Sequence, residues 1–309
     1  MTPQSGLLPE GNAHGLFLTL DLSRDPTAPA AARSLLAQIP AMTTTLAAAA
    51  PGDGLVSVAS IGTGIWSTLT DAAKPKGMAD FRARANGPRK APATPADLLL
   101  HIRSERRDLN HALAQRILAK AGASLTIREE IAGFRYLDAR DLTGFVDGTE
   151  NPQGDERADV AMIGDEDPAH AGGSFVMAQR YVHDLSRWNR LAQQAQEAVI
   201  GRTKDSDEEL DDAVRPDSAH ISRVVIDEDG EELEILRHSM PYGDNSESGL
   251  LFIAYSRRQA IFDAMLDRMF DTAPEGPAGV HDHLMDYTRA KTGAYFFAPS
   301  LEALAALRP

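Results

Sequence analysis

The sequence predicts an α+β protein built from two ferredoxin-like halves, each a split βαβ arrangement with helices on one face of an antiparallel sheet. In the first half, strand-like and helix-like segments follow one another in the order β-α-β-β-α-β. The rest of the chain shows a similar order, although no sequence repeat links the halves. The length of 309 residues allows two domains of about 150 residues each. We place an N-terminal domain at 1–140 and a C-terminal domain at 141–309, with 141–172 as a connecting loop.

The first half has well-separated elements. Runs of apolar residues predict strands, and Ala-rich or amphipathic runs predict helices. The predicted strands are 15–22, 54–61, 97–102 and 123–133, and the predicted helices are 28–50, broken at Pro40, and 105–121. Residues 74–95 are rich in Lys, Arg, Pro and Gly and have no persistent period, so we expect an exposed loop with solvated charges.

The second half repeats this alternation. The predicted strands are 173–182, 223–226, 233–236, 250–255 and 293–297, and the predicted helices are 185–200 and 258–270. Asp229-Gly230 lies between two apolar runs, which is a strong signal for a β-hairpin.

The composition is that of an ordinary globular protein, with 43% hydrophobic and 25% charged residues. Its 31 basic and 45 acidic residues give a net charge of −14, which disfavours nucleic acid and anionic membranes as partners. Cysteine is absent, so disulfides, thiolate ligands and cysteine nucleophiles are excluded. No export signal is present at the N-terminus, and no apolar run is long enough to span a membrane. We therefore expect a cytoplasmic protein.

The segment 144–152, with the sequence GFVDGTENP, is the most informative stretch. Gly144 and Gly148 allow positive φ or close backbone approach, and Asn151-Pro152 ends any regular element. Asp147 is thus a carboxylate on a constrained loop. From residue types alone, an Asx-type turn in which Asp147 bonds its own backbone is an open alternative.

This segment closely resembles the signature of the dye-decolourising peroxidases, a haem family. In that family the motif Asp, here Asp147, lies on the distal face of the haem. The axial ligand is a later His in an H-x-x-R context, which matches His220 to Arg223, and an Arg on a following strand matches Arg237. All three features occur in the family order.

The resemblance covers most of 95–300 in scattered motifs. It implies a type B-like member with a fold of the dimeric α/β-barrel superfamily and one non-covalent haem b per chain. It also implies a homo-oligomer, dimeric or larger. Relatives with extended tails can be encapsulated. Residues 300–309 form no flexible extension, so we do not expect encapsulation here.

The residue pattern itself favours Arg237, whereas the choice of His220 follows from the resemblance. Nine histidines compete as ligands, and the pair in His281-Asp282-His283 resembles a metal motif but is more often a turn. Alternation along 233–239 places Arg237 and Ser239 on the core side and His238 outside. A buried arginine needs an anion, which a haem pocket provides. A regular hairpin would bring position 220 close to position 239, whereas a haem needs its ligand and its distal arginine on opposite faces. We therefore expect the strand pairing to open before it reaches position 220.

Further site residues follow from the resemblance. Arg202 matches an arginine that neutralises a haem propionate, although a solvated helix-end charge explains it equally. Asp286 matches an acid that hydrogen-bonds the axial imidazole. Gly148 and Asn151 belong to the cofactor-binding loop, and Ser239 stands where some relatives have Asn. The acidic run 205–212 is expected to be a solvated loop.

The implied function is a peroxidase that reduces hydrogen peroxide and oxidises dyes, phenolics or similar one-electron donors through a ferryl intermediate. Asp147 would move the proton and Arg237 would stabilise charge, with Asp147 near its ordinary pKa of about 3.9 and activity improving in acid. Trp188 and Tyr181 are candidate electron relays, with core packing as the alternative. Two rival functions stay open, namely a haem-handling protein that removes iron or stores haem, and a non-haem binding module. The sequence does not identify the natural reductant.

Overall fold

The computed structural model describes residues 1–273 and 279–308, and Pro309 of the expected tail lies outside them. Ten strands form one antiparallel sheet in the order β10-β12-β11-β6-β1-β5-β2-β14-β7-β13. Those of the first half are β1 (His14–Leu22), β2 (Val56–Gly62), β5 (Leu98–Ser104) and β6 (Leu125–Phe134). Those of the second half are β7 (Ser174–His183), β10 (Leu236–Arg237), β11 (Met240–Gly243), β12 (Ser248–Ser256), β13 (Thr288–Ala290) and β14 (Ala294–Ala298).

The two halves share one topology. In the first, the spatial order is β6-β1-β5-β2, and in the second it is β14-β7-β12-β11. Counting the main strands of each half along the chain, both orders read 4-1-3-2, which is the split βαβ arrangement. The predicted α+β fold class is therefore confirmed.

The two four-stranded sheets close into a ring. Strand β12 pairs with β7 as well as with β11, while β14 pairs with β2 and β11 meets β6 at Tyr242 and Gly133. A Cβ on Gly133 would lie 2.7 Å from Cβ of Met240, so this seam requires glycine. Phe17 from β1 and Val176 from β7 belong to one apolar cluster that fills the ring. Both faces of most strands are consequently buried.

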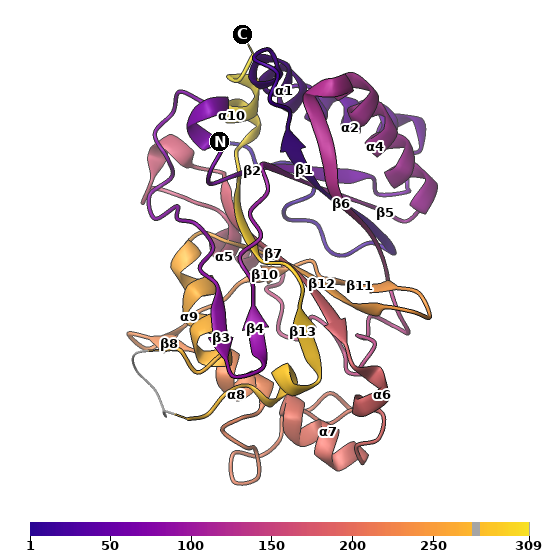
Figure 1. The fold of residues 1–309 in the computed structure, drawn as a ribbon, viewed down its shortest axis with the longest axis vertical. Helices are drawn as coiled ribbons and strands as arrows, with labels where there is room; N and C mark the ends of the chain where they lie inside the picture. The colour runs from indigo at the N-terminus through magenta and orange to yellow at the C-terminus, as the bar shows by residue number, and fades with distance from the viewer. Residues whose placement is uncertain (274–278, 309) are drawn as a thin grey trace.

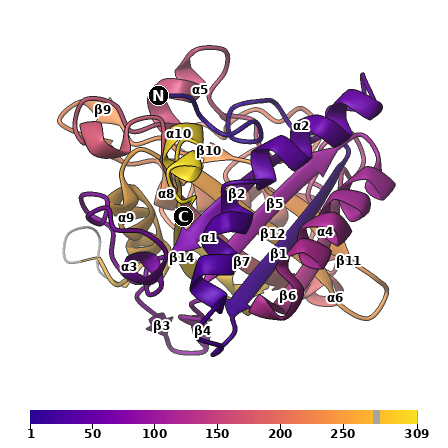
Figure 2. The ribbon, with the colours of Figure 1, turned by 90° about the horizontal axis from the view of Figure 1, so that it is seen from above.

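Helices cover the outer faces of the two sheets. The first half carries α1 (Ala28–Leu36), α2 (Ile39–Ala49), α3 (Trp66–Leu69) and α4 (Arg107–Ala121), followed by the 3₁₀ turn η1 (Gly122–Ser124). The second carries α5 (Glu156–Ala161), η2 (Pro168–His170), α6 (Leu185–Trp188), α7 (Gln193–Ile200), α8 (His220–Val224), α9 (Gln259–Met269), η3 (His283–Asp286) and α10 (Leu301–Ala305). Helix α4 buries Leu109, Leu113 and Ile117 at helical spacing. Figures 1 and 2 show α1, α2 and α4 together over the first sheet, and Figure 1 shows α7, α8 and α9 in the opposite half of the molecule.

Three sequence expectations are wrong in detail. The predicted strand at 223–226 is helix α8, and the hairpin at Asp229-Gly230 retains only β8 (Asp227–Glu228) and β9 (Glu231–Glu232). The ladder thus opens before His220, as expected from the geometry. The predicted helix 185–200 is two helices, because Trp188 turns inward and its indole donates to the Thr143 carbonyl at 2.9 Å.

The basic loop 74–95 is also more ordered than predicted. It contains the hairpin of β3 (Arg84–Asn86) and β4 (Arg89–Ala91). Arg84 is not solvated but buried, because it forms ion pairs with Asp263 and Asp267 on α9. This contact ties the hairpin to the helix beneath it.

Across 1–273 and 279–308, no helix has both the length and the apolar character needed to cross a membrane. The cytoplasmic location stays a prediction.

We expect Arg84→Met to lower the free energy of unfolding by about 3 kcal/mol, because it leaves two carboxylates without their buried partner. Arg82→Met is the matched control. Arg82 contacts the same Asp267 at 2.5 Å, but its side chain is 62% exposed, so its loss should cost less than about 1 kcal/mol. Urea unfolding of both variants measures the difference, and equal losses would contradict the burial argument.

Candidate functional site

The loop that carries Asp147 is fixed by its own backbone. The Asp147 amide donates to the Ala139 carbonyl at 2.9 Å, and the Gly144 amide donates to the Asp141 carbonyl at 2.8 Å. Gly144 and Gly148 have φ values of +90° and +87°, which side-chain-bearing residues rarely adopt. Both glycines therefore perform the backbone role that the sequence predicted.

The Asx turn in this loop is made by Asp141 and not by Asp147. The Asp141 carboxylate accepts from the Thr143 amide at 2.9 Å and from the Thr143 hydroxyl at 2.6 Å. The Asp147 carboxylate has no hydrogen-bond partner among the residues that the structure describes, and it faces a cavity. This arrangement is expected for a carboxylate that acts on a bound molecule.

The cavity lies in the second half and has a largely apolar wall. Its lining comes from β7, α8, the segment between β9 and β10, β12, α9 and η3. The apolar lining residues include Met177, Ile221, Val224, Leu233, Ile235, Phe252, Met265, Leu266 and Met269. Its polar lining residues include Asp147, His183, His220 and Arg237. A small number of polar groups in an apolar cavity is typical of a cofactor or ligand site.

His220 stands at the start of α8 with one ring nitrogen engaged. Its Nδ1 donates to Asp282 Oδ2 at 2.6 Å, because an ionised carboxylate can only accept. The Asp282 side chain is fully buried, and its other oxygen accepts from the Leu284 amide at 2.8 Å. This leaves the His220 Nε2 lone pair available to the cavity.

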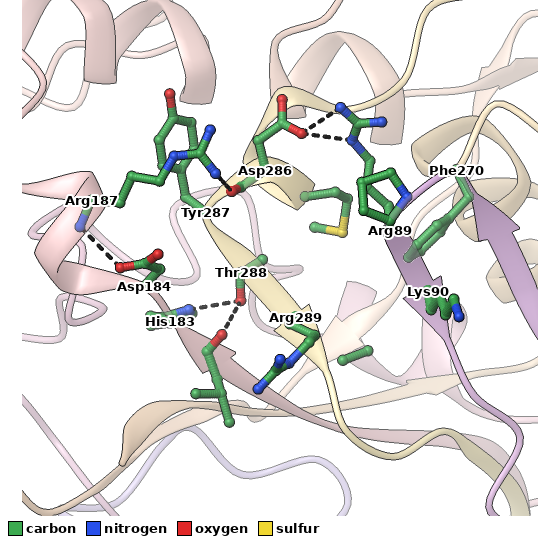
Figure 3. A pocket seen from close by; sticks show the side chains of 14 residues that line it. Arg89, Lys90, His183, Asp184, Arg187, Phe270, Asp286, Tyr287, Thr288 and Arg289 are labelled. Carbon is green, nitrogen blue, oxygen red and sulfur yellow. Dashed lines mark hydrogen bonds and ion pairs between the residues drawn. The ribbon is translucent and has the colours of Figure 1, made fainter. Parts of the chain in front are cut away.

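Asp286 does not fill the role assigned to it. Its carboxylate pairs with Arg89 at 2.5 Å and lies 3.3 Å from His281 Nε2, as the Arg89 contact in Figure 3 shows. The prediction is wrong because Asp286 ends η3 and faces the β3–β4 hairpin. Asp282 caps the start of η3 and faces α8 instead. Burial would raise the pKa of Asp286, but His281 and Arg89 together lower it.

Arg237 is held through its backbone by Asn151. The Asn151 amide group donates to the Arg237 carbonyl at 2.9 Å, and the Arg237 amide donates to Asn151 Oδ1 at 2.8 Å. The Arg237 Nε is buried and has no partner among residues 1–273 and 279–308. Asn151 therefore positions the backbone of Arg237, a role that its turn-forming character did not reveal.

Ser239 and His238 continue this strand. The Ser239 hydroxyl accepts from the Ile253 amide at 3.2 Å, and Ser239 lines a second cavity together with Asp147, Gly148 and Arg237. His238 was expected to point outward but is buried, with Nε2 donating to the Leu7 carbonyl at 2.7 Å. The reason is the closed ring, which gives this strand no solvent face.

Burial controls the acidity of Asp147. Loss of hydration raises the pKa of Asp147 to about 6, although the positive charge of Arg237 acts in the opposite direction. The expectation of a pKa near 3.9 is therefore wrong. Asp147 can both accept and return a proton close to neutral pH.

Arg202 lies behind the cavity wall. Its guanidinium pairs with Glu150 at 2.5 Å, with Asp207 at 3.0 Å and with Glu209 at 3.4 Å. Glu150 itself lines the cavity. The acidic run 205–212 is thus anchored in part by Arg202 and is not simply solvated. Its predicted propionate contact stays a prediction.

Sequence reasoning missed His183 and Asp282. His183, on β7, bonds Thr288 Oγ1 at 2.8 Å and Asp141 Oδ1 at 3.1 Å while lining the cavity. Burial alone would raise the pKa of Asp141, but His183 and Thr143 lower it to about 2. The one sequence signal for Asp282 was that an Asp favours the capping position before a turn. The two flanking histidines drew attention away from it, because they suggested a metal motif.

The fold and this cavity define a class of protein, namely an α+β barrel in which the His220 imidazole, the Asp147 carboxylate and the Arg237 guanidinium line one largely apolar cavity. The family model of the Dyp-type peroxidase N-terminal part matches residues 4–135, and that of the C-terminal part matches residues 138–303. The chain belongs to the Dyp-type peroxidase family.

Individual relatives agree with this assignment. The dye-decolorizing peroxidase of Mycobacterium tuberculosis is 41% identical over 98% of this chain and 90% of its own length, and that of Rhodococcus erythropolis is 38% identical over 98% and 88%. A variant of DypB from Rhodococcus jostii RHA1 in complex with heme superimposes with a TM-score of 0.94 at 39% identity, covering 99% and 98% of the two chains. The activity is that of a haem-dependent dye-decolourising peroxidase.

We expect Asp147→Asn to stabilise the ligand-free protein at pH 7.5 but not near pH 4. The folded-state pKa of about 6 exceeds the ordinary 3.8, so ionised Asp147 opposes folding above about pH 6 and this cost disappears as the pH falls. The gain is about 1.4 kcal/mol for each pH unit between the two pKa values. Urea unfolding at both pH values measures it.

Asp141→Asn is the opposite control. The folded-state pKa of Asp141 is about 2, so its ionised form supports folding above 3.8 and the variant should be destabilised at pH 7.5. Stability changes of the same sign in both variants would show that desolvation does not set the acidity of Asp147.

Proposed function

We propose that this chain binds one haem b non-covalently, with His220 Nε2 as the axial ligand and with Asp147 and Arg237 on the distal side. The observation that carries the proposal is the hydrogen bond from His220 Nδ1 to the buried Asp282. It fixes the tautomer and leaves Nε2 basic, which is the arrangement that iron-ligating histidines require.

The cavity fits such a group in three respects. Its wall is mostly apolar, as a porphyrin face requires. The chain contains no cysteine and supplies no thiolate, so histidine is the strongest iron donor available. The unpartnered Nε of Arg237 needs an anion or a polar ligand atom, which bound peroxide would supply.

The haem, when bound, supplies the redox chemistry that splits hydrogen peroxide and accepts electrons singly from a donor. Asp147 takes a proton from the incoming peroxide and returns it to the departing oxygen. A pKa of about 6 suits both steps, since the carboxylate is ionised at neutral pH and gains a proton under mildly acidic conditions. Arg237 stabilises the negative charge that develops as the oxygen–oxygen bond lengthens.

Hydrogen peroxide and an aromatic one-electron donor are the proposed substrates. Trp188 is fully buried between Phe145, which belongs to the Asp147 loop, and the half-buried Tyr287, with ring centroids 6.1 Å and 5.4 Å away. This aromatic series supports Trp188 as an electron relay more than Tyr181, whose hydroxyl bonds Gln179 in the interior. Self-association of the chain stays a prediction.

We expect Asp282→Asn to weaken haem binding about 10–100-fold, because the amide is a poorer acceptor for the imidazole and leaves the ligand less basic. Asp286→Asn is the matched control and should bind haem as the unmodified protein does. Titration of haem into the ligand-free proteins, followed by the Soret band, measures both. If Asp286→Asn weakened binding as much as Asp282→Asn, the assignment of the partner would be wrong.

We expect Arg237→Leu to lower the rate of peroxide consumption by about 10²–10³-fold, since it removes the fixed cation at the site of developing charge. Arg128→Leu, an exposed arginine on β6, is the control.

A second measurement addresses Asp147. The peroxide rate of the haem-loaded protein should change with an inflection near pH 6, and Asp147→Asn should remove that inflection. An unchanged pH profile in this variant would assign the proton transfer to another group.

A further inference from the structure

We propose that His281, His283 and Asp286 form a second metal site, which binds a divalent transition-metal cation outside the haem cavity. One ligand atom from each of the three side chains lies within 4.8 Å of the other two. His281 Nε2 is 3.3 Å from Asp286 Oδ2, and the two imidazole centroids are 5.0 Å apart.

The donor set suits zinc or a neighbouring transition ion. Two imidazoles and one carboxylate are an established zinc combination, with bonds of about 2.0–2.2 Å and a fourth position open to water. Two ligand atoms with such bonds lie about 3.4 Å apart in a tetrahedral site. His281 Nε2 and Asp286 Oδ2 are already 3.3 Å apart, and all three ligand atoms lie within 4.8 Å of one another. His283 is exposed, and within 1–273 and 279–308 its ring bonds only the Ser218 hydroxyl, through Nδ1 at 3.2 Å, so the ring can move toward the other two donors.

Arg89 orients the Asp286 carboxylate. It occupies Asp286 Oδ1, while Oδ2 is directed to His281. Figure 3 shows Arg89 reaching Asp286 from β4. The remaining oxygen is therefore presented toward the imidazoles. The nearby positive charge of Arg89 at the same time limits the affinity for a cation.

This metal site adjoins Asp282, the residue that supports the proposed haem ligand His220. Asp282 lies between the two histidines in sequence, and its carboxylate holds His220. A cation bound to His281, His283 and Asp286 would fix both ends of the turn η3 that carries Asp282. Metal binding would thus act on the support of the axial ligand without entering the cavity.

Isothermal titration of Zn²⁺ into the haem-loaded protein tests the proposal. We expect one saturable site per chain, weakened by at least about 10-fold in His281→Gln and in His283→Ala, because even indirect partners of a metal contribute that much. His111→Ala, which removes an exposed histidine on α4, should bind Zn²⁺ as the unmodified protein does.

Arg89→Gln separates this site from incidental binding to surface histidines. Removal of the competing cation frees Asp286 Oδ1, so this variant should bind Zn²⁺ more tightly. A retained Soret band in each variant shows that the fold and the haem site are intact. The proposal is overturned if the unmodified protein shows no saturable site, or if His281→Gln and His283→Ala bind Zn²⁺ as tightly as His111→Ala.

Discussion

The contact between His220 and Asp282 joins positions 62 residues apart, and the candidate site depends on it. Asp282 is fully buried, so its charge must be compensated within the protein, and the imidazole and the Leu284 amide share that task. The bond also fixes which ring nitrogen is free. A short turn and a short helix, each with little intrinsic stability, are thereby held in register on one side of the cavity.

The other side of the cavity is governed by a balance between hydration and charge. Asp147 loses its hydration on a loop held by several backbone hydrogen bonds, and this loss outweighs the attraction of Arg237. Arg237 is itself held by Asn151 through its backbone, so its guanidinium remains available to a bound molecule. The site therefore contains a carboxyl group that can exchange a proton and a cation that cannot. These are the complementary properties that peroxide chemistry uses.

Much of the fold and the centre of the site could be predicted from the sequence, because strand and helix periods are local and the 144–152 motif is contiguous. The wrong predictions concern features that depend on tertiary structure and not on local sequence. Whether Asp282 or Asp286 meets His220 depends on which way a four-residue turn faces, and both residues carry the same group. Arg84 looked solvated because its partners Asp263 and Asp267 lie about 180 residues away. His238 looked exposed because alternation assumes a sheet with one wet face, which ring closure removes.

Ring closure also explains why the cavity lies where it does. Packing the two sheets face to face fills most of the space between them with side chains such as Phe17 and Val176, so the ring interior is largely a hydrophobic core. The cavity that contains Asp147, His220 and Arg237 lies outside this core, between the second sheet and its covering helices. There the hairpin ladder ends after two residue pairs, and α8 turns away from β10. The interruption of regular pairing thus creates the space, and the two histidine-to-carboxylate contacts of His220 and His183 define its polar boundary.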